Sequence, residues 1–319
     1  MRILHICAGW QRNNGAAVIA RLIADEQRAQ GEEVRFGTWA SVREVRAADV
    51  VWVHCGWLPC LWWASLFAKR LIRMPEACYD PIRLDYHGWK KRLVGPIERF
   101  FLRRATKVLA TCEAEAEWIR AYEPRANVEV TDIKRFFKLE SFGDQAKAPL
   151  RGTLREYAVS PHSDFRSDRL RADTSALHIL YLGRRHPLKG VEYLERAVAG
   201  MRDEGRGKRI ELRIVSNATG EELEKVWEWC DVLVLPTLSE NFGLVVAEAL
   251  ERGKKVVTTD GAPVWEPPEA AAVHSAQCLV PSADGRLVYL KGYREGTDEE
   301  RVELLVEAMR RIKLYNTSV

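Results

Sequence analysis

Short apolar runs alternate with amphipathic stretches along the whole chain. Runs without internal alternation, such as 49–54 and 231–235, predict strands that are buried on both faces. Further strands are predicted at 2–8, 33–38, 82–86, 107–111, 127–131, 177–182, 209–215 and 254–258. Helices are predicted at 16–30, 57–72, 92–105, 113–122, 189–203, 219–229, 242–252 and 298–313. Strands and helices that alternate at this spacing predict doubly wound α/β layers with parallel sheets.

One segment interrupts this alternation. Residues 138–173 are polar, rich in Arg and Ser, and without helical periodicity. We interpret them as an interdomain connection that begins at about residue 138. The chain of 319 residues is long enough for two domains, which we place at 1–172 and 173–319.

The most informative stretch runs from Asp231 to Leu250. It predicts a buried strand, a turn with a proline, and a helix that Ser239 or Glu240 caps. The amides that open such a helix lack partners within it and attract anions. They are expected at Asn241, Phe242 and Gly243.

Two carboxylates flank this helix start. Glu240 and Glu248 are eight residues apart, just over two helical turns, so we expect them to face roughly one side. An acid at the mouth of an anion site suits hydroxyl groups that lie beside a phosphate. Gly243 allows a ligand to approach the backbone closely.

A pair of cations follows the predicted strand at 177–182. Arg184 and Lys189 flank a turn in which Gly183 and Gly190 permit tight backbone geometry. An arginine binds phosphate oxygens in a fork, and a lysine acts as a point charge. Exposed cations in isolation are more often simply solvated, but the Gly-Arg…Lys-Gly context of this pair favours a phosphate site at the carboxyl edge of a sheet.

These two segments, in this order, resemble the retaining GT-B glycosyltransferases of the GT4 type, also called group 1. The matching residues are Glu240-x7-Glu248 and the Gly-Arg…Lys-Gly of 183–190. The segment Thr258 to Glu266 resembles a turn of the lipopolysaccharide and surface-polysaccharide enzymes in that family. The resemblance implies two Rossmann-like domains that face a central cleft, and a last helix that crosses back to the first domain.

The resemblance also implies an activity, the retaining transfer of a sugar from a nucleotide-diphospho-sugar to a saccharide or lipid-linked saccharide. UDP- or GDP-linked donors are expected, with no cofactor and no metal. The implied catalytic residues are Glu240, His87, Arg184 and Lys189. The implied donor-binding residues are Gly15, Gly183, Asn241, Phe242, Gly243, Leu244 and Glu248. Arg12 and Asn14 are implied to contact the acceptor.

Alternatives remain for the residues of the first half. The loop from Gly9 to Ala17 lacks the Gly-x-Gly-x-x-Gly fingerprint, and a plain turn between strand and helix also fits it. His87 in Asp85-Tyr-His-Gly88 follows a predicted strand, where a lone histidine is more often structural. Its resemblance to the His-Gly turn of the family's first domain favours contact with the sugar near the reacting carbon. A dehydrogenase is disfavoured because the dinucleotide fingerprint is missing.

Charge and composition indicate which classes of binding partner to expect. The chain carries a net charge of +4, and residues 57–107 hold eleven Lys or Arg against four acids, interleaved with aromatic side chains. This segment predicts contact with an anionic membrane surface. A buried helix with a solvated basic face is the alternative. We expect no nucleic-acid partner, because no recognition motif accompanies the basic segment.

Cysteine usage and hydropathy indicate the compartment. The seven cysteines lie at irregular spacing, without pairs at zinc-ligand distance, and we expect no signal peptide. The longest apolar run, Trp57 to Ala68, is too short to span a bilayer. We therefore expect a cytoplasmic protein, peripheral on the inner membrane face. The region 214–231 is shorter than the family pattern, so a non-catalytic GT-B paralogue that acts as a partner subunit is the second hypothesis.

Overall fold

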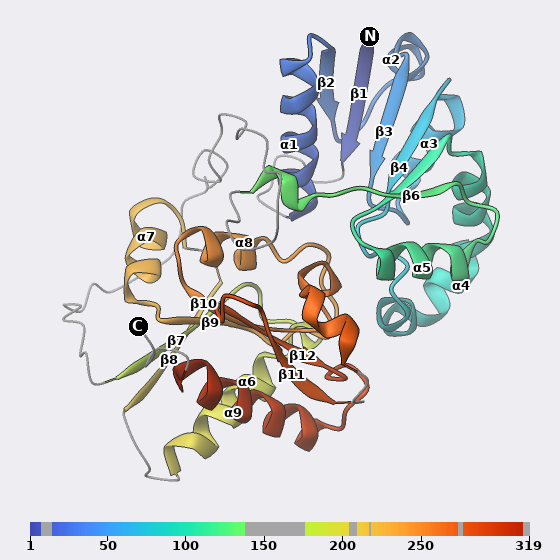
Figure 1. Ribbon diagram of the computed structural model, residues 1–319. Helices are drawn as coiled ribbons and strands as arrows, with labels where there is room; N and C mark the ends of the chain where they lie inside the picture. Colours follow the sequence, from blue (N-terminus) through green and yellow to red (C-terminus); the bar gives the residue numbers. More distant parts are fainter. Residues whose placement is uncertain (8–14, 138–175, 204–208, 217, 274–276, 315–319) are drawn as a thin grey trace. The chain divides into compact units, whose positions relative to one another are not determined.

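The computed structural model describes residues 1–7, 15–137, 176–203, 209–216, 218–273 and 277–314. Two compact units make up the molecule (Figure 1). The first holds the described residues up to Phe136, and the second holds those from Phe137 onward. The predicted connection at 138–173 and the predicted boundary at 172 lie outside the described residues.

The first unit is built on a six-stranded parallel sheet with the order β2-β1-β3-β4-β5-β6. Its strands are β1 (Arg2–Cys7), β2 (Glu33–Gly37), β3 (Val50–His54), β4 (Leu71–Met74), β5 (Lys107–Ala110) and β6 (Val128–Val130). Its helices are α1 (Gly15–Ala29), α2 (Val42–Ala47), α3 (Pro59–Phe67), α4 (Pro81–Arg104) and α5 (Glu113–Tyr122), and a short 3-10 turn covers Lys134–Phe136.

The core of this unit confirms the predicted central strand. Val51 and Val53 of β3 are fully buried, as is Ile6 of β1 beside them. Strands in the middle of a parallel sheet are covered on both faces, which explains the uninterrupted apolar run.

Two predictions in the first unit are wrong. The predicted helix at 57–72 ends at Phe67, and its last residues form β4. The predicted strand at 82–86 lies inside α4. Asp80 caps α4 by accepting a hydrogen bond of 3.0 Å from the amide of Ile82, and Pro81 occupies the first helical position.

The second unit also contains a six-stranded sheet, with the order β11-β12-β10-β9-β7-β8, in which β11 is antiparallel to β12. Its strands are β7 (Leu177–Leu182), β8 (Ile210–Val215), β9 (Val232–Leu235), β10 (Lys255–Thr259), β11 (Cys278–Pro281) and β12 (Leu287–Lys291). Its helices are α6 (Val191–Asp203), α7 (Gly220–Trp229), α8 (Leu244–Glu251) and α9 (Asp298–Leu314), and 3-10 turns cover Pro187–Lys189, Pro263–Trp265 and Pro268–Ala272.

The final helix packs within the second unit. Leu305, Ala308 and Ile312 of α9 are buried, and the helix contacts α6, β10 and β12. Figure 1 shows α6 and α9 side by side. The crossing of the last helix to the first domain stays a prediction.

The two sheets confirm the predicted fold class of two Rossmann-like α/β layers. The strands β11 and β12, together with α2, were not predicted from the sequence. Among the described residues, α7 is the only regular element between β8 and β9. This agrees with the sequence comparison, in which the region 214–231 is shorter than the pattern of the family.

Candidate functional site

Two loops meet at the carboxyl edge of the second sheet, where doubly wound folds bind ligands. One loop follows β7 and ends at Gly190, and the other joins β9 to α8. The Thr237 hydroxyl donates to the backbone oxygens of Leu188 and Ser239, each at 3.0 Å. The amide of Leu238 donates to the Leu188 oxygen at 2.9 Å. These bonds fix the two loops against each other.

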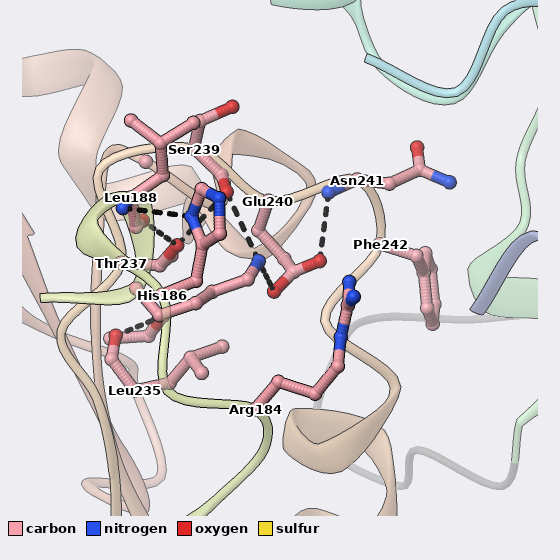
Figure 2. Close-up of polar contacts among 12 residues, drawn as sticks. Arg184, His186, Leu188, Leu235, Thr237, Ser239, Glu240, Asn241 and Phe242 are labelled. Atoms are coloured by element: carbon pink, nitrogen blue, oxygen red, sulfur yellow. Dashed lines mark hydrogen bonds and ion pairs between the residues drawn. The ribbon is translucent and has the colours of Figure 1, made fainter. Parts of the chain in front are cut away.

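An ion pair between Lys189 and Glu240 joins the same loops (Figure 2). The Lys189 Nζ lies 2.5 Å from Oε2 of Glu240 and 3.1 Å from the backbone oxygen of Ser239. The other carboxylate oxygen, Oε1, accepts a hydrogen bond of 3.0 Å from the amide of Asn241. Both side chains are partly buried. The ammonium is therefore held at the edge of the sheet while part of it faces solvent.

Arg184 supplies a second cation from the β7 loop. Its backbone oxygen accepts a 2.9 Å hydrogen bond from the Tyr181 hydroxyl, which orders the start of the loop. Its side chain is exposed, and Figure 2 shows the guanidinium directed toward the segment from Glu240 to Phe242. Both predicted cations are therefore directed toward the β9–α8 loop, Lys189 through its bonds to Ser239 and Glu240 and Arg184 through the direction of its guanidinium.

The helix α8 begins later than the sequence predicted. Gly243 is its N-cap, with φ 69° and no side-chain cap. The prediction that Ser239 or Glu240 caps the helix is wrong, because both lie in the loop before it. The opening amides with no cap are those of Leu244 and Val245, so the anion site predicted for this helix moves toward them.

Residues behind the loop hold it in this position. The Phe242 ring is buried, 5.0 Å from the Phe137 ring and 5.2 Å from the Trp265 ring. The indole nitrogen of Trp265 donates a 2.5 Å hydrogen bond to the Phe242 backbone oxygen. A Cβ on Gly261 would lie 2.0 Å from the Thr237 oxygen, so only glycine fits there.

Thr237 and Trp265 were not predicted as site residues. The one sequence signal for Trp265 was the turn at 261–265, which resembles the polysaccharide enzymes.

Glu248 lies within α8 and is half-buried. Burial raises the pKa of its carboxyl to about 7, against an opposing effect of Arg252. Among the described residues, none donates a hydrogen bond to this carboxylate. Because Glu240 precedes the helix, the expectation that Glu240 and Glu248 share one helical face is wrong. A desolvated acid without an internal donor is suited to bind hydroxyl groups of a ligand.

The remaining predicted residues lie elsewhere. Gly183 follows β7, and a Cβ there would lie 3.1 Å from the Tyr181 hydroxyl. Gly15 is the first residue of α1. Arg12 and Asn14 lie outside the described residues. His87 falls within α4 beside Gly88, rather than after a strand, and its side chain also lies outside what the structure describes.

The described part of the chain shows neither a metal-binding cluster nor a membrane-spanning helix. It contains no group of three or more His, Cys, Asp or Glu side chains that could hold a metal ion. None of its helices combines the length and the apolar character needed to cross a bilayer.

Family comparisons agree with this geometry in both units. Residues 35–132 match the glycosyl transferase 4-like domain, and residues 176–288 match the domain of glycosyl transferases group 1. The chain belongs to the GT4-like, group 1 glycosyltransferases. It is a transferase of the GT-B type that uses a nucleotide sugar. Among curated proteins, no sequence match was found.

Solved structures show the same fold. Sucrose-phosphate synthase from Thermosynechococcus elongatus is 14% identical with a TM-score of 0.61, over 98% of this chain and 90% of that one. Anabaena HepE, solved with UDP-glucose, is 15% identical with a TM-score of 0.51, over 99% and 95%. WaaG, a glycosyltransferase involved in lipopolysaccharide biosynthesis, is 13% identical with a TM-score of 0.53, over 98% and 92%. At these identities the likeness concerns the fold.

Proposed function

We propose that this glycosyltransferase transfers a sugar, with retention of anomeric configuration, from a UDP- or GDP-linked donor to a saccharide or lipid-linked saccharide of the cell envelope. The observation that carries the proposal is the Lys189–Glu240 pair, which lies beside the uncapped start of α8. Cations, free amides and carboxylates at one sheet edge match a diphosphate attached to two hydroxyl-bearing sugars.

The leaving diphosphate is stabilised by fixed positive charge. As the bond between the sugar carbon and the phosphate oxygen breaks, charge develops on that oxygen. Arg184, Lys189 and the amides of Leu244 and Val245 stabilise it, an electrostatic effect that is usually the largest in catalysis. The acceptor oxygen forms the new bond and passes its proton to the departing phosphate. Because the protein supplies the charges, we propose that the reaction needs no metal and no cofactor.

The carboxylates of the second unit bind hydroxyl groups of the donor in this proposal. In this proposal Glu240 accepts hydrogen bonds from hydroxyls of the transferred sugar, and Glu248 accepts them from the ribose. Gly183, Asn241, Phe242 and Gly243 shape the donor site through their backbones.

For the first unit the proposal rests on the family resemblance alone. It assigns donor contact to Gly15, contact with the sugar near the reacting carbon to His87, and acceptor binding to Arg12 and Asn14.

The acceptor places the reaction at a membrane. The basic and aromatic segment 57–107 supports a peripheral position on the cytoplasmic face of the inner membrane. The fold shared with WaaG, an enzyme of lipopolysaccharide biosynthesis, supports an envelope saccharide as the acceptor class.

The test measures binding and slow hydrolysis of UDP-, GDP-, ADP- and CMP-linked sugars with a chelator present. We expect one donor to bind, and proton NMR to show that the released sugar keeps the donor's anomeric configuration. Lys189→Ala and Glu240→Gln should each lower the rate by about 100-fold or more. The matched control is Arg185→Gln, because Arg185 lies in the same loop but pairs with Glu195. Inverted configuration, or full activity in Lys189→Ala, would refute the proposal.

A non-catalytic partner subunit is the second candidate. In the part of the chain that the structure describes, α7 alone lies between β8 and β9, which favours this candidate because the corresponding region of the family commonly helps to hold the nucleotide base. This candidate predicts that the folded protein binds no donor and that Glu240→Gln leaves function intact.

A further inference from the structure

A pocket of about 570 Å³ opens in the first unit beside α4. Its volume lies in the range of small-molecule sites, about 300–1,000 Å³. Four of its lining residues are cations, Lys91, Arg92, Arg99 and Arg103, and one is an acid, Asp85. Such an excess of positive charge favours an anionic ligand.

Aromatic rings position two of these cations. The Lys91 ammonium lies 5.0 Å from the centre of the Trp57 ring, and it donates a 3.2 Å hydrogen bond to the Cys78 backbone oxygen. The Arg99 guanidinium carbon lies 4.8 Å from the centre of the Tyr122 ring. Because these groups are already ordered, a ligand loses less conformational entropy in binding them.

The other two cations, Arg92 and Arg103, are exposed and are not held by an aromatic ring among the described residues. Arg92 is exposed and, within the described residues, makes no hydrogen bond or ion pair. Arg103 pairs loosely with Glu123, at 3.8 Å. A guanidinium in this situation can bind two oxygens of one phosphate in parallel.

The wall formed by Trp57 is strained and firmly held. Its φ of 67° is disfavoured for a residue with a side chain. Oε1 of Glu98 accepts a 2.5 Å hydrogen bond from the Trp57 amide, and Oε2 lies 3.1 Å from the buried Arg73 guanidinium. Strain of this kind is concentrated at functional sites such as ligand clamps, and here Glu98 holds the strained wall in place.

A row of exposed apolar side chains borders the pocket on α4. Trp89 and Leu93 are 70% and 73% exposed, and Ile97 and Phe100 are 42% and 47% exposed. At about 100° per residue these four lie within about 80° of one another around the helix. The arginines that line the pocket lie on the adjoining face.

The charge around this row decides which partner fits it. Exposed apolar patches of this kind mark protein or membrane contacts. A second copy of the chain, related by a two-fold axis, would bring the basic segment 57–107 against itself. An anionic lipid surface offers both the negative charge and the apolar layer, so it fits both features.

We propose that the pocket binds the phosphate of an anionic lipid headgroup while Trp89, Leu93, Ile97 and Phe100 enter the apolar layer below it. Interfacial helices bury their apolar faces to such a shallow depth. The inference rests on the proposed function in one respect, because a transferase with a lipid-linked acceptor works at a membrane. It adds a defined phosphate site to that contact.

The test is flotation of the full chain with vesicles of pure phosphatidylcholine and vesicles of equal parts phosphatidylcholine and phosphatidylglycerol. We expect binding to the second kind alone, weakened by salt. Arg92→Gln and Arg99→Gln should each weaken it about fivefold to tenfold. The control Arg120→Gln removes an exposed cation from α5 and should have little effect. Trp89→Ala should weaken binding, whereas Trp39→Ala, at another exposed tryptophan, should not.

Several outcomes would overturn the inference. Equal binding to neutral and anionic vesicles would show that the phosphate site has no role in binding. Binding to neither kind of vesicle would exclude a membrane as the partner. Loss of a dimer in Trp89→Ala without vesicle binding would identify a second copy as the partner. Arg92-dependent binding of glycerol 3-phosphate without vesicle binding would identify a soluble phosphate ester.

Donor binding, measured on the same samples, separates the two proposals. Arg92→Gln should retain it, so its loss of vesicle binding concerns this inference alone. A wild-type protein that binds vesicles but no donor would contradict only the proposed function.

Discussion

The two units form the turns at the carboxyl edges of their sheets by different means. In the second unit glycine occupies the left-handed positions, with φ 60° at Gly190 and 69° at Gly243. In the first unit, residues with side chains take φ values from 58° to 67°: Cys55, Trp57, Glu76 and Ala77. The same backbone conformation therefore costs little in one unit and is strained in the other.

The supporting contacts differ accordingly. A Cβ on Gly190 would lie 2.1 Å from the Pro236 oxygen, so the missing side chain itself allows the loops to meet. In the first unit, buried carboxylates stabilise the strained amides. Glu98 accepts from Trp57, and Glu115 accepts a 2.6 Å hydrogen bond from Ala77. One site depends on small residues, and the other depends on long-range polar contacts.

The largest expected effect is the loss of a buried carboxylate. Burial alone would raise the pKa of Glu98, but Arg73 and hydrogen bonds from Trp62, Trp57 and Tyr79 lower it. Glu98→Ala leaves the Arg73 charge buried without its partner, so the free energy of unfolding of the first unit should fall by about 3–5 kcal/mol. Hydrogen exchange of the β3 amides measures it.

The control for this prediction is Glu129→Ala, which breaks an exposed pair with Lys107 and should cost less than about 1 kcal/mol. Equal losses in the two variants would show that Glu98 does not hold the strained loop.

The second effect concerns the glycine loop. Gly190→Ala forces the Pro236 carbonyl to move and should lower the free energy of unfolding by at least about 3 kcal/mol, with loss of donor binding. Gly253 also has a left-handed φ, 68°, but open space around its Cβ position. Gly253→Ala should therefore cost only about 1–2 kcal/mol. A similar cost for both would contradict the close approach; thermal unfolding of the two variants measures it.

A smaller effect depends on pH. The pKa of Glu248 is about 7 in the fold, above its ordinary value of 4.5. Between about pH 5 and pH 7 the folded state therefore binds the extra proton, and its stability falls as pH rises. Glu248→Gln removes this dependence, so relative to wild type the variant should gain about 2 kcal/mol between pH 5 and pH 8. Urea unfolding at both pH values measures it, and parallel pH curves would refute the shift.

The smallest effect tests the strain itself. Ala77→Gly relieves a φ of 59°, which offsets the loss of a buried methyl group, so its stability should stay within about 1 kcal/mol of wild type. Ala116→Gly, at a buried position of α5, gains no such relief and should lose about 2 kcal/mol. Denaturant titration compares the two. A larger loss for Ala77→Gly would mean that its backbone is not strained.

The same contrast explains what the sequence could predict. Gly183, Gly190 and Gly243 mark the second site locally, and the two cations and Glu240 lie close to them, so the loops and their charges could be predicted. The start of α8 was misplaced because its cap is a glycine, which leaves no side-chain signal.

The first unit gave fewer local signals. The run Leu71–Met74 is too short to distinguish a buried strand from a helix by periodicity. The strained turn at Trp57 depends on Glu98, 41 positions away in the sequence, and no spacing rule connects the two. The pocket beside α4 could therefore not be predicted, although the basic and aromatic composition of its segment was evident.

The central claim is that the donor binds at the β7 and β9 loops of the second unit. Backbone hydrogen exchange with and without the donor selected by the binding panel tests it most directly. We predict slower exchange at the Leu244 and Val245 amides and along 183–190, lost in Lys189→Ala. Donor binding with no protection there, or with protection confined to the first unit, would contradict the account.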